Sequence, residues 1–268
     1  MTDSYQLEIA KKLAYDEVNV TQKNPLKELG KLLVQIVLIL VCFYAVLYIG
    51  SGIILNNLSF DQQVKLEKML SSRGNYERAD ISSEQQEQLL AIRDRILSID
   101  KDYPKTSELN MSVINSKSIN AMCYVDGTIH ITKGLYDLMK SEEELTFIIA
   151  HEMGHYKHRD HMHSLRHSLS TQIVLFFVAL TSSDNQQINS LASGGINMSN
   201  LKYSRVAEFR ADRYATEMSN AIYGHANGGI DAMNIFLTLE NSSLEIPDFL
   251  STHPNTKARI ANIKKHSK

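Results

Sequence analysis

The sequence predicts an α+β, mostly helical chain with a small sheet and an N-terminal transmembrane helix. Three observations predict this fold class. Residues 32–55 form one uncharged apolar run, several later segments carry apolar residues at helical spacing, and the period changes to two over residues 109–131. We expect an N-terminal tail at 1–31, an anchor at 32–55, a helical linker region at 56–107 and a folded domain at 108–268.

Composition limits the classes of partner. The 28 basic and 30 acidic side chains give a formal net charge of -2, whereas a nucleic-acid-binding chain would show a basic face. The two cysteines, Cys42 and Cys123, are too few for a disulfide framework and do not indicate a redox compartment. We therefore expect no nucleic-acid partner.

The N-terminal part of the sequence predicts a membrane anchor. Residues 1–31 are polar and mixed in charge, and they fit either a weak helix or a flexible tail. The run from Leu32 to Leu55 would be about 36 Å long as a helix, which exceeds a hydrocarbon core of about 30 Å. The alternative is a buried core helix. We expect no cleavable signal peptide, because the run starts too late and is too long.

Charges around the run predict its orientation. Near the run the basic residues show a small bias: Lys12, Lys23, Lys27 and Lys31 lie before it, and Lys65, Lys68 and Arg73 lie after it. This bias favours a single-pass protein with a cytoplasmic N-terminus. The folded domain would then lie on the opposite side, which is the periplasm if the source is a Gram-negative bacterium.

Residues 56–107 predict two helices. The first carries Val64, Leu66 and Leu70, and the chain breaks at Arg73-Gly74-Asn75. The second begins at the capping box Ser82 to Gln85 and places Leu89, Ile92 and Ile96 on one face.

The segment that follows predicts the sheet. Residues 109–113 alternate as a half-buried strand does, and residues 124–131 predict a hairpin with a tight turn at Asp126-Gly127. Asn120 and Ala121 stand just before this hairpin. Proteases often bind substrate as an added strand at a sheet edge, so both residues are candidate substrate contacts. The alternative is a purely structural sheet.

The sequence His151-Glu152-Met153-Gly154-His155 has metal-ligand spacing. Ser141 to Glu144 predict a capped helix start, and Leu145, Ile148 and Ile149 continue at helical spacing. Residues four apart share a helix face, so the two histidines can bind one tetrahedral Zn²⁺. Glu152 can take a proton from a water held by the metal. The alternative is an amphipathic helix that carries two histidines by chance.

The residues after this motif carry weaker signals. His158, His161, His163 and His167 could form a second metal site, but a solvated, mildly basic helix face fits their spacing better. Residues 168–182 predict a buried or interfacial helix, because the run is short for a membrane span. Residues 182–200, rich in Ser, Asn and Gly, predict a mobile loop.

A third metal ligand is predicted at Glu208. Glu208 and Asp212 lie four apart on a predicted helix, so Asp212 can hydrogen-bond a ligand histidine and fix its tautomer. Two histidines and one glutamate leave a fourth position for water, which is typical of a catalytic zinc site. The alternative is an exposed helix carboxylate paired with Arg205 or Arg213. Near the C-terminus, Asn255 is expected to cap a last helix.

These motifs together resemble a known family. Asn120-Ala121, Gly134-Leu135, the motif from His151 to His155, the motif from Glu208 to Asp212 and Thr252-His253-Pro254 resemble the gluzincin metallopeptidases of the HtpX, Oma and CAAX-prenyl-protease types, metallopeptidase family forty-eight. The resemblance covers residues 108–262. Those HtpX and prenyl-protease types carry several membrane spans, whereas this sequence has one clear span.

The resemblance implies a zincin-like metallopeptidase domain at 108–268 with one Zn²⁺ per chain. It implies zinc on His151, His155 and Glu208, Glu152 as the base and proton shuttle, and Asp212 in support. It suggests His253 as an oxyanion or substrate contact, although a His-Pro pair can also serve only to shape the turn.

The predicted function is a membrane-anchored zinc-dependent endopeptidase acting in protein quality control or processing. Its partners would be a protein or peptide substrate and the membrane. Two alternatives remain: a zinc hydrolase that does not cleave peptides, and a tethered binding or chaperone-like module with a vestigial zinc site. The sequence does not indicate an oligomeric state.

Overall fold

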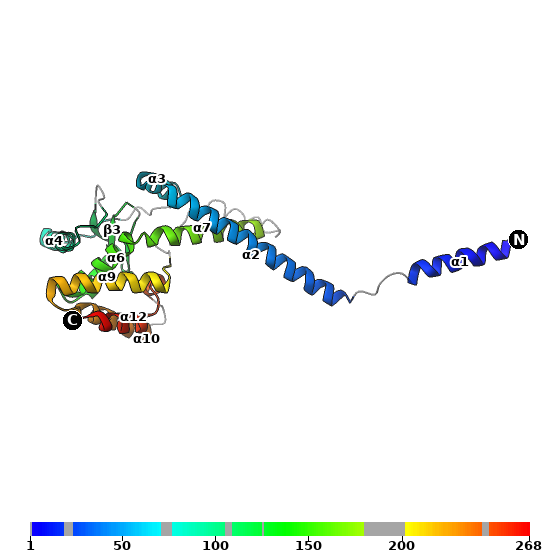
Figure 1. Ribbon diagram of the computed structural model, residues 1–268. Helices are drawn as coiled ribbons and strands as arrows, with labels where there is room; N and C mark the ends of the chain where they lie inside the picture. The colour runs from blue at the N-terminus through cyan, green and yellow to red at the C-terminus, as the bar shows by residue number, and fades with distance from the viewer. Residues whose placement is uncertain are drawn as a thin grey trace. The chain divides into compact units, whose positions relative to one another are not determined.

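The computed structural model describes residues 2–18, 24–70, 77–104, 109–124, 126–179, 202–242 and 247–268 (Figure 1). The chain divides into two compact units, Met1–Leu47 and Tyr48–Lys268. The predicted break at 73–75 and the predicted loop at 182–200 lie outside the described residues.

The N-terminal unit is helical. Helix α1 spans Thr2–Val18, so residues 1–31 contain a helix rather than only a flexible tail. Helix α2 spans Pro25–Asn57 and contains the whole predicted run 32–55. It begins earlier because proline suits the first helical position and the side-chain oxygen of Asn24 accepts from the Leu26 N–H at 3.0 Å.

Helix α2 is the one helix of the described residues that is long and apolar enough to cross a membrane. Most of its large apolar side chains are exposed, with Ile39 at 66% and Val46 at 68%, although Leu55 near its end is buried. A buried core helix, the alternative drawn from the sequence, would cover these side chains.

The predicted linker region is helical where it is described. Helix α3 spans Phe60–Leu70 and helix α4 spans Ser83–Ile99. The predicted capping box at Ser82 is complete, because Ser82 and Gln85 each accept a hydrogen bond from the other's backbone N–H. Leu89, Ile92 and Ile96 are fully buried, as their spacing predicts.

The sheet has three strands in the order β1 (Met111–Ile114), β3 (Ile129–Thr132), β2 (Ala121–Cys123). Strand β1 is parallel to β3, and β2 is antiparallel to β3, as the predicted hairpin requires. The turn is closed by the Tyr124 N–H, which donates to the Thr128 carbonyl at 2.9 Å, and Gly127 supplies a positive φ of 85°. Strand β2 begins at Ala121, before the segment that the sequence assigned to the hairpin.

The expectation of a half-buried strand at 109–113 is wrong, because all four residues of β1 are buried. Met111 and Val113 face the main core, as alternation predicts. The other face is covered as well, since Ile114 packs with Met122 and Tyr124 in a second apolar cluster. A polar residue in the pattern therefore did not indicate a solvent-facing side.

The core is built around helix α6, Glu142–Lys157, which follows the short helix α5, Lys133–Leu138. Every residue from Glu144 to Tyr156 is buried, so α6 is covered on all sides. Helix α9 (Arg205–Tyr223), helix α10 (Asn227–Ser242), α4 and β2 pack around it, and helix α12 (Thr256–His266) packs on α9 and α10 (Figure 1).

The start of helix α7, Asp160–Ala179, corrects the expectation of a solvated basic face. His163 and His167 are exposed, but Asp160 and His161 are only 2% and 3% exposed. A two-residue connection turns the chain back on α6, so the His161 ring stacks on Tyr156 with 5.7 Å between centroids. These two polar residues consequently face the interior.

The later part of α7 is exposed rather than buried. Ile173, Leu175, Phe177 and Val178 are between 38% and 49% exposed. Of the two interpretations of 168–182, the buried helix is therefore wrong over these residues, and the interfacial helix stays a prediction.

The C-terminal segment brings His253 to the core. Helix α11 spans Asp248–Thr252 and ends directly before His253. Asn255 occupies the N-cap position of α12, but its side chain makes no capping hydrogen bond, contrary to expectation. Its φ of 72° is left-handed, and asparagine tolerates this conformation better than most residues.

Candidate metal centre

Helices α6 and α9 approach each other closely at Gly154. A Cβ atom on Gly154 would lie 3.1 Å from the Ala211 Cα and 3.2 Å from the Tyr214 ring. Gly154 is a poor helix former, so its presence inside α6 is explained by the approach of another backbone. The contact sets the two predicted motifs, one on each helix, against each other.

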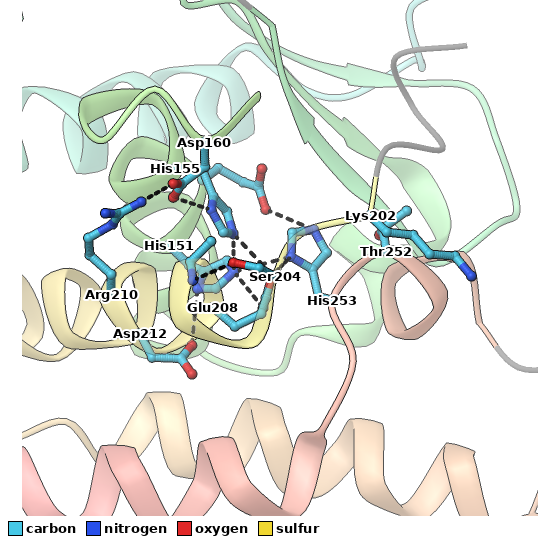
Figure 2. Close-up of polar contacts among 12 residues, drawn as sticks. His151, His155, Asp160, Lys202, Ser204, Glu208, Arg210, Asp212, Thr252 and His253 are labelled. Atoms are coloured by element: carbon cyan, nitrogen blue, oxygen red, sulfur yellow. Dashed lines mark hydrogen bonds and ion pairs between the residues drawn. The ribbon is translucent and has the colours of Figure 1, made fainter. Parts of the chain in front are cut away.

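The two motifs converge on one point (Figure 2). The Nε2 atoms of His151 and His155 are 3.0 Å apart. Glu208 Oε2 lies 3.6 Å from His151 Nε2, and Glu208 Oε1 lies 3.4 Å from His155 Nε2. Ligand atoms bound to one tetrahedral zinc at its usual bond lengths would be about 3.4 Å apart. All three side chains are fully buried, so the alternative of an exposed Glu208 is excluded.

His253, which the resemblance suggests as an oxyanion or substrate contact, lies among the possible metal ligands themselves. Its Nδ1 lies 3.1 Å from Glu208 Oε1 and 3.3 Å from His151 Nε2. Ligand atoms from these two histidines, His155 and Glu208 all lie within 4.8 Å of one another. The imidazole stacks on Phe249 at 4.4 Å between centroids, so α11 fixes its orientation. His253 therefore does more than shape a turn.

The electrostatics of the group fit a divalent cation. Both carboxylate oxygens of Glu152 are buried without a hydrogen-bond partner among the described residues, and His253 Nε2 lies 3.6 Å from Glu152 Oε1. Four carboxylates (Glu152, Asp160, Glu208 and Asp212) face two guanidinium groups (Arg210 and Arg259), so the group is negative when its imidazoles are neutral, as they are in metal ligands. A divalent ion would offset this charge, because buried charges require a counter-charge.

The Nε2 atoms of His151 and His155 are only 3.0 Å apart, so they cannot both carry a proton. Burial, with Arg259 and His155 nearby, lowers the pKa of His151, so this ring is neutral and able to bind a metal. Burial also acts to lower the pKa of His155, but hydrogen bonds to Asp160 and Glu208 outweigh it and raise this pKa. Burial would raise the pKa of Glu208, yet His253 and Arg259 hold it well below its usual range.

Asp212 contacts His151, one of the candidate metal ligands, as its spacing predicts. Its Oδ1 lies 3.0 Å from His151 Nδ1, which leaves Nε2 of that ring facing the group. The arginine that holds Asp212 was not predicted. Arg259 on α12 is fully buried and binds both oxygens of Asp212, through Nη2 at 2.7 Å and Nε at 2.9 Å. Its Nη1 lies 3.1 Å from Glu208 Oε2, so one guanidinium braces both carboxylates.

Two further contacts lie beyond the sequence motifs. The Tyr203 ring stacks on His155 with 3.9 Å between centroids and 10° between planes. Its backbone N–H donates to the Thr252 carbonyl at 3.2 Å, which ties the start of α9 to α11. Asp160 Oδ2 lies 3.0 Å from His155 Nδ1. No periodicity in the sequence links Tyr203 or Asp160 to the histidine that each contacts.

Asn120 and Ala121 lie outside the metal-ligand group, at the start of β2. The Asn120 N–H donates to Thr132 Oγ1 at 2.9 Å, and its carbonyl accepts from the Thr132 N–H at 3.0 Å. The Asn120 side-chain oxygen is buried without a hydrogen-bond partner in the described part of the chain. Strand β2 is an edge strand of the sheet and packs against α6.

A family model described as Peptidase family M48 matches residues 83–267, which is more than half of the chain. The chain belongs to peptidase family M48. The resemblance inferred from the motifs is therefore confirmed. The matched range includes the metal-ligand group and all of α4, so it begins earlier than the domain boundary expected from the sequence.

Three curated M48 relatives are similar to the chain at low identity. Metalloendopeptidase OMA1, mitochondrial, from Bos taurus is 23% identical over 65% of this chain and 35% of its own length. Metalloprotease YcaL from Escherichia coli (strain K12) is 22% identical over 58% of this chain and 61% of its own. The protein named "Putative beta-barrel assembly-enhancing protease" from Vibrio cholerae is 27% identical over 58% of this chain and 34% of its own length. The chain thus spans between a third and three fifths of these relatives.

We predict that Arg259→Leu lowers the free energy of unfolding of the metal-free protein by about 3–5 kcal/mol. Removing this guanidinium leaves Asp212 and Glu208 buried with one counter-charge fewer. Urea unfolding of the full chain in detergent measures the change. Lys257→Leu, at an exposed position of the same helix, is the control and should change the value little. An Arg259→Leu protein as stable as the wild type would show that the brace contributes nothing.

Proposed function

We propose that the chain is a membrane-anchored, zinc-dependent endopeptidase with a zincin-like domain. The observation that carries this proposal is the meeting of three buried ligand side chains, two from α6 and one from α9, beside a Glu152 carboxylate without a hydrogen-bond partner among the described residues. Membership of peptidase family M48 supports it.

Three residues would hold the zinc ion: His151 and His155 through Nε2, and Glu208 through its carboxylate. This donor set suits zinc, and catalytic zinc sites use three protein ligands with an open fourth position. A bound zinc ion supplies Lewis acidity and lowers the pKa of water in that position to about 7. His253 Nδ1 faces the same point, so movement of α11 would decide whether the fourth position is open.

Glu152 is assigned the proton transfers. It follows His151 on α6, so its carboxylate sits beside the ligands without being one of them. It takes a proton from the attacking water and delivers it to the leaving amine, and no acyl-enzyme is formed. The His253 ring, with Nε2 3.6 Å from Glu152 Oε1, would contact the developing oxyanion or the substrate when it turns from the ligand group.

The edge of β2 is the proposed substrate-binding strand. An extended peptide added there would run along α6, which carries His151 and Glu152. Asn120 and Ala121 at the start of this strand would contact it. The buried side-chain oxygen of Asn120, which has no hydrogen-bond partner in the described residues, is available to accept from a peptide N–H.

Helix α2 is the proposed single-pass anchor, with the N-terminus in the cytoplasm and the M48 domain on the other side. The names of the relatives, a mitochondrial metalloendopeptidase and a beta-barrel assembly-enhancing protease, support a role in protein quality control or processing. The Glu152 carboxylate and the complete ligand group weigh against a vestigial zinc site in a binding module, and membership of a peptidase family weighs against a hydrolase that acts only on non-peptide bonds.

Glu152→Gln is expected to keep one zinc per chain and to lose peptide cleavage, by about 100-fold or more, because a neutral amide cannot accept the proton. Metal analysis and cleavage of casein by the full chain in detergent measure the two properties. Glu143→Gln on the same helix, whose side chain is 37% exposed, is the matched control and should retain activity. Equal cleavage by Glu152→Gln and wild type would refute the assignment of the base.

The full chain is expected to stay with the membrane pellet after alkaline carbonate washing, because α2 would span the bilayer. In sealed vesicles of known sidedness, protease added on the cytoplasmic side should remove residues before α2 and spare the M48 domain. Release into the supernatant would contradict the anchor. Digestion of the domain from the cytoplasmic side would show that the orientation is opposite to the one proposed.

A further inference from the structure

The two ligand histidines of α6 are each held at Nδ1 by a different carboxylate. Asp212 on α9 holds His151, and this contact follows from the spacing of the α9 motif. Asp160, the first residue of α7, holds His155 at 3.0 Å. Nothing in the metal-binding motifs points to Asp160, which lies five residues after the histidine that it contacts.

The side chain of Asp160 is buried at this contact. Its side chain is 2% exposed, and its second oxygen, Oδ1, is paired with the guanidinium of Arg210 (Figure 2). Arg210 lies on α9 between Glu208 and Asp212, so α9 braces both histidines, one directly and one through Asp160.

The backbone is strained at the residue before Asp160. Arg159 has a φ of 57°, a left-handed conformation that is unfavourable for a non-glycine residue. Its N–H donates to the Tyr156 carbonyl at 2.9 Å, so α6 ends and α7 starts within two residues. The strained residue thus stands directly before the carboxylate that contacts His155.

Each histidine is therefore the last of three residues linked by side-chain contacts. His151 contacts Asp212, which is bound by Arg259, and His155 contacts Asp160, which is bound by Arg210. In both series of contacts the carboxylate holds Nδ1 of the ring, so that Nε2 faces the point where the candidate ligands meet. Such a partner orients the imidazole and increases its basicity as a ligand.

We propose that Asp160, held by Arg210, is a positioning residue that orients His155 for zinc binding. The inference rests on the proposed function, because it assumes that His155 is a zinc ligand. It adds a residue outside both motifs to the site. A merely structural role for Asp160, as an anchor of α7, predicts loss of stability without a change in zinc affinity.

The test is the zinc dissociation constant of the full chain in detergent, measured by competition with a chromophoric chelator. Asp160→Ala is expected to weaken zinc binding about 10–100-fold, the range typical of such partners. Asp160→Asn keeps an acceptor oxygen for the Nδ1–H and should fall between Asp160→Ala and wild type. Thermal unfolding of the metal-free variants reports their folding separately.

Asp100→Ala is the matched control. Asp100 is another largely buried carboxylate beside α6, bound to Lys157 at 2.5 Å and to Tyr214 at 3.0 Å, and it contacts none of the ligand residues. Its removal should lower stability and leave zinc affinity unchanged. Zinc binding by Asp160→Ala within twofold of wild type would overturn the proposal, as would an equal loss in Asp100→Ala.

If Asp160→Ala does not fold, Asp160→Asn decides, and zinc affinity within twofold of wild type overturns the proposal. Peptide cleavage is scored apart from zinc binding. A wild-type chain that binds zinc but cleaves no peptide contradicts the proposed function, while the comparison of dissociation constants still decides the role of Asp160. A wild-type chain that binds no zinc contradicts both.

Discussion

The site depends on the close approach of α6 and α9 at Gly154 and Ala211. A Cβ atom at position 154 would lie 3.1 Å from the Ala211 Cα, which is tighter than an ordinary contact, so glycine is the residue that fits this approach without displacing the α9 backbone. The approach matters for the site because His151 and His155 are fixed to α6 and Glu208 is fixed to α9. Packing of two helices that are distant in the sequence therefore determines whether the ligands can share one ion.

Burial of charge is the second constraint on this arrangement. Four carboxylates surround three imidazoles, and Arg210 and Arg259 pair with three of these carboxylates. The fourth, Glu152, has no guanidinium partner and no hydrogen bond within the described part of the chain. The excess negative charge favours a bound cation, and the unsatisfied carboxylate beside it is suited to proton transfer.

The sequence was sufficient where a regular period connected the residues. Helical spacing placed His151 with His155 and Glu208 with Asp212, and the capping box located the start of α4. It was insufficient where contacts depend on how helices turn and pack. Asp160 reaches His155 through a two-residue turn with a left-handed Arg159, and Arg259 reaches Asp212 from α12. Alternation in β1 indicated two faces but not that both are covered.

The most direct test of this account is the position of the metal in a crystal of the zinc-loaded chain, located by anomalous scattering at the zinc absorption edge. The account predicts one strong peak per chain, within about 2.0–2.3 Å of His151 Nε2, His155 Nε2 and a Glu208 oxygen. A peak at the exposed His163 and His167, with none between α6 and α9, would contradict it.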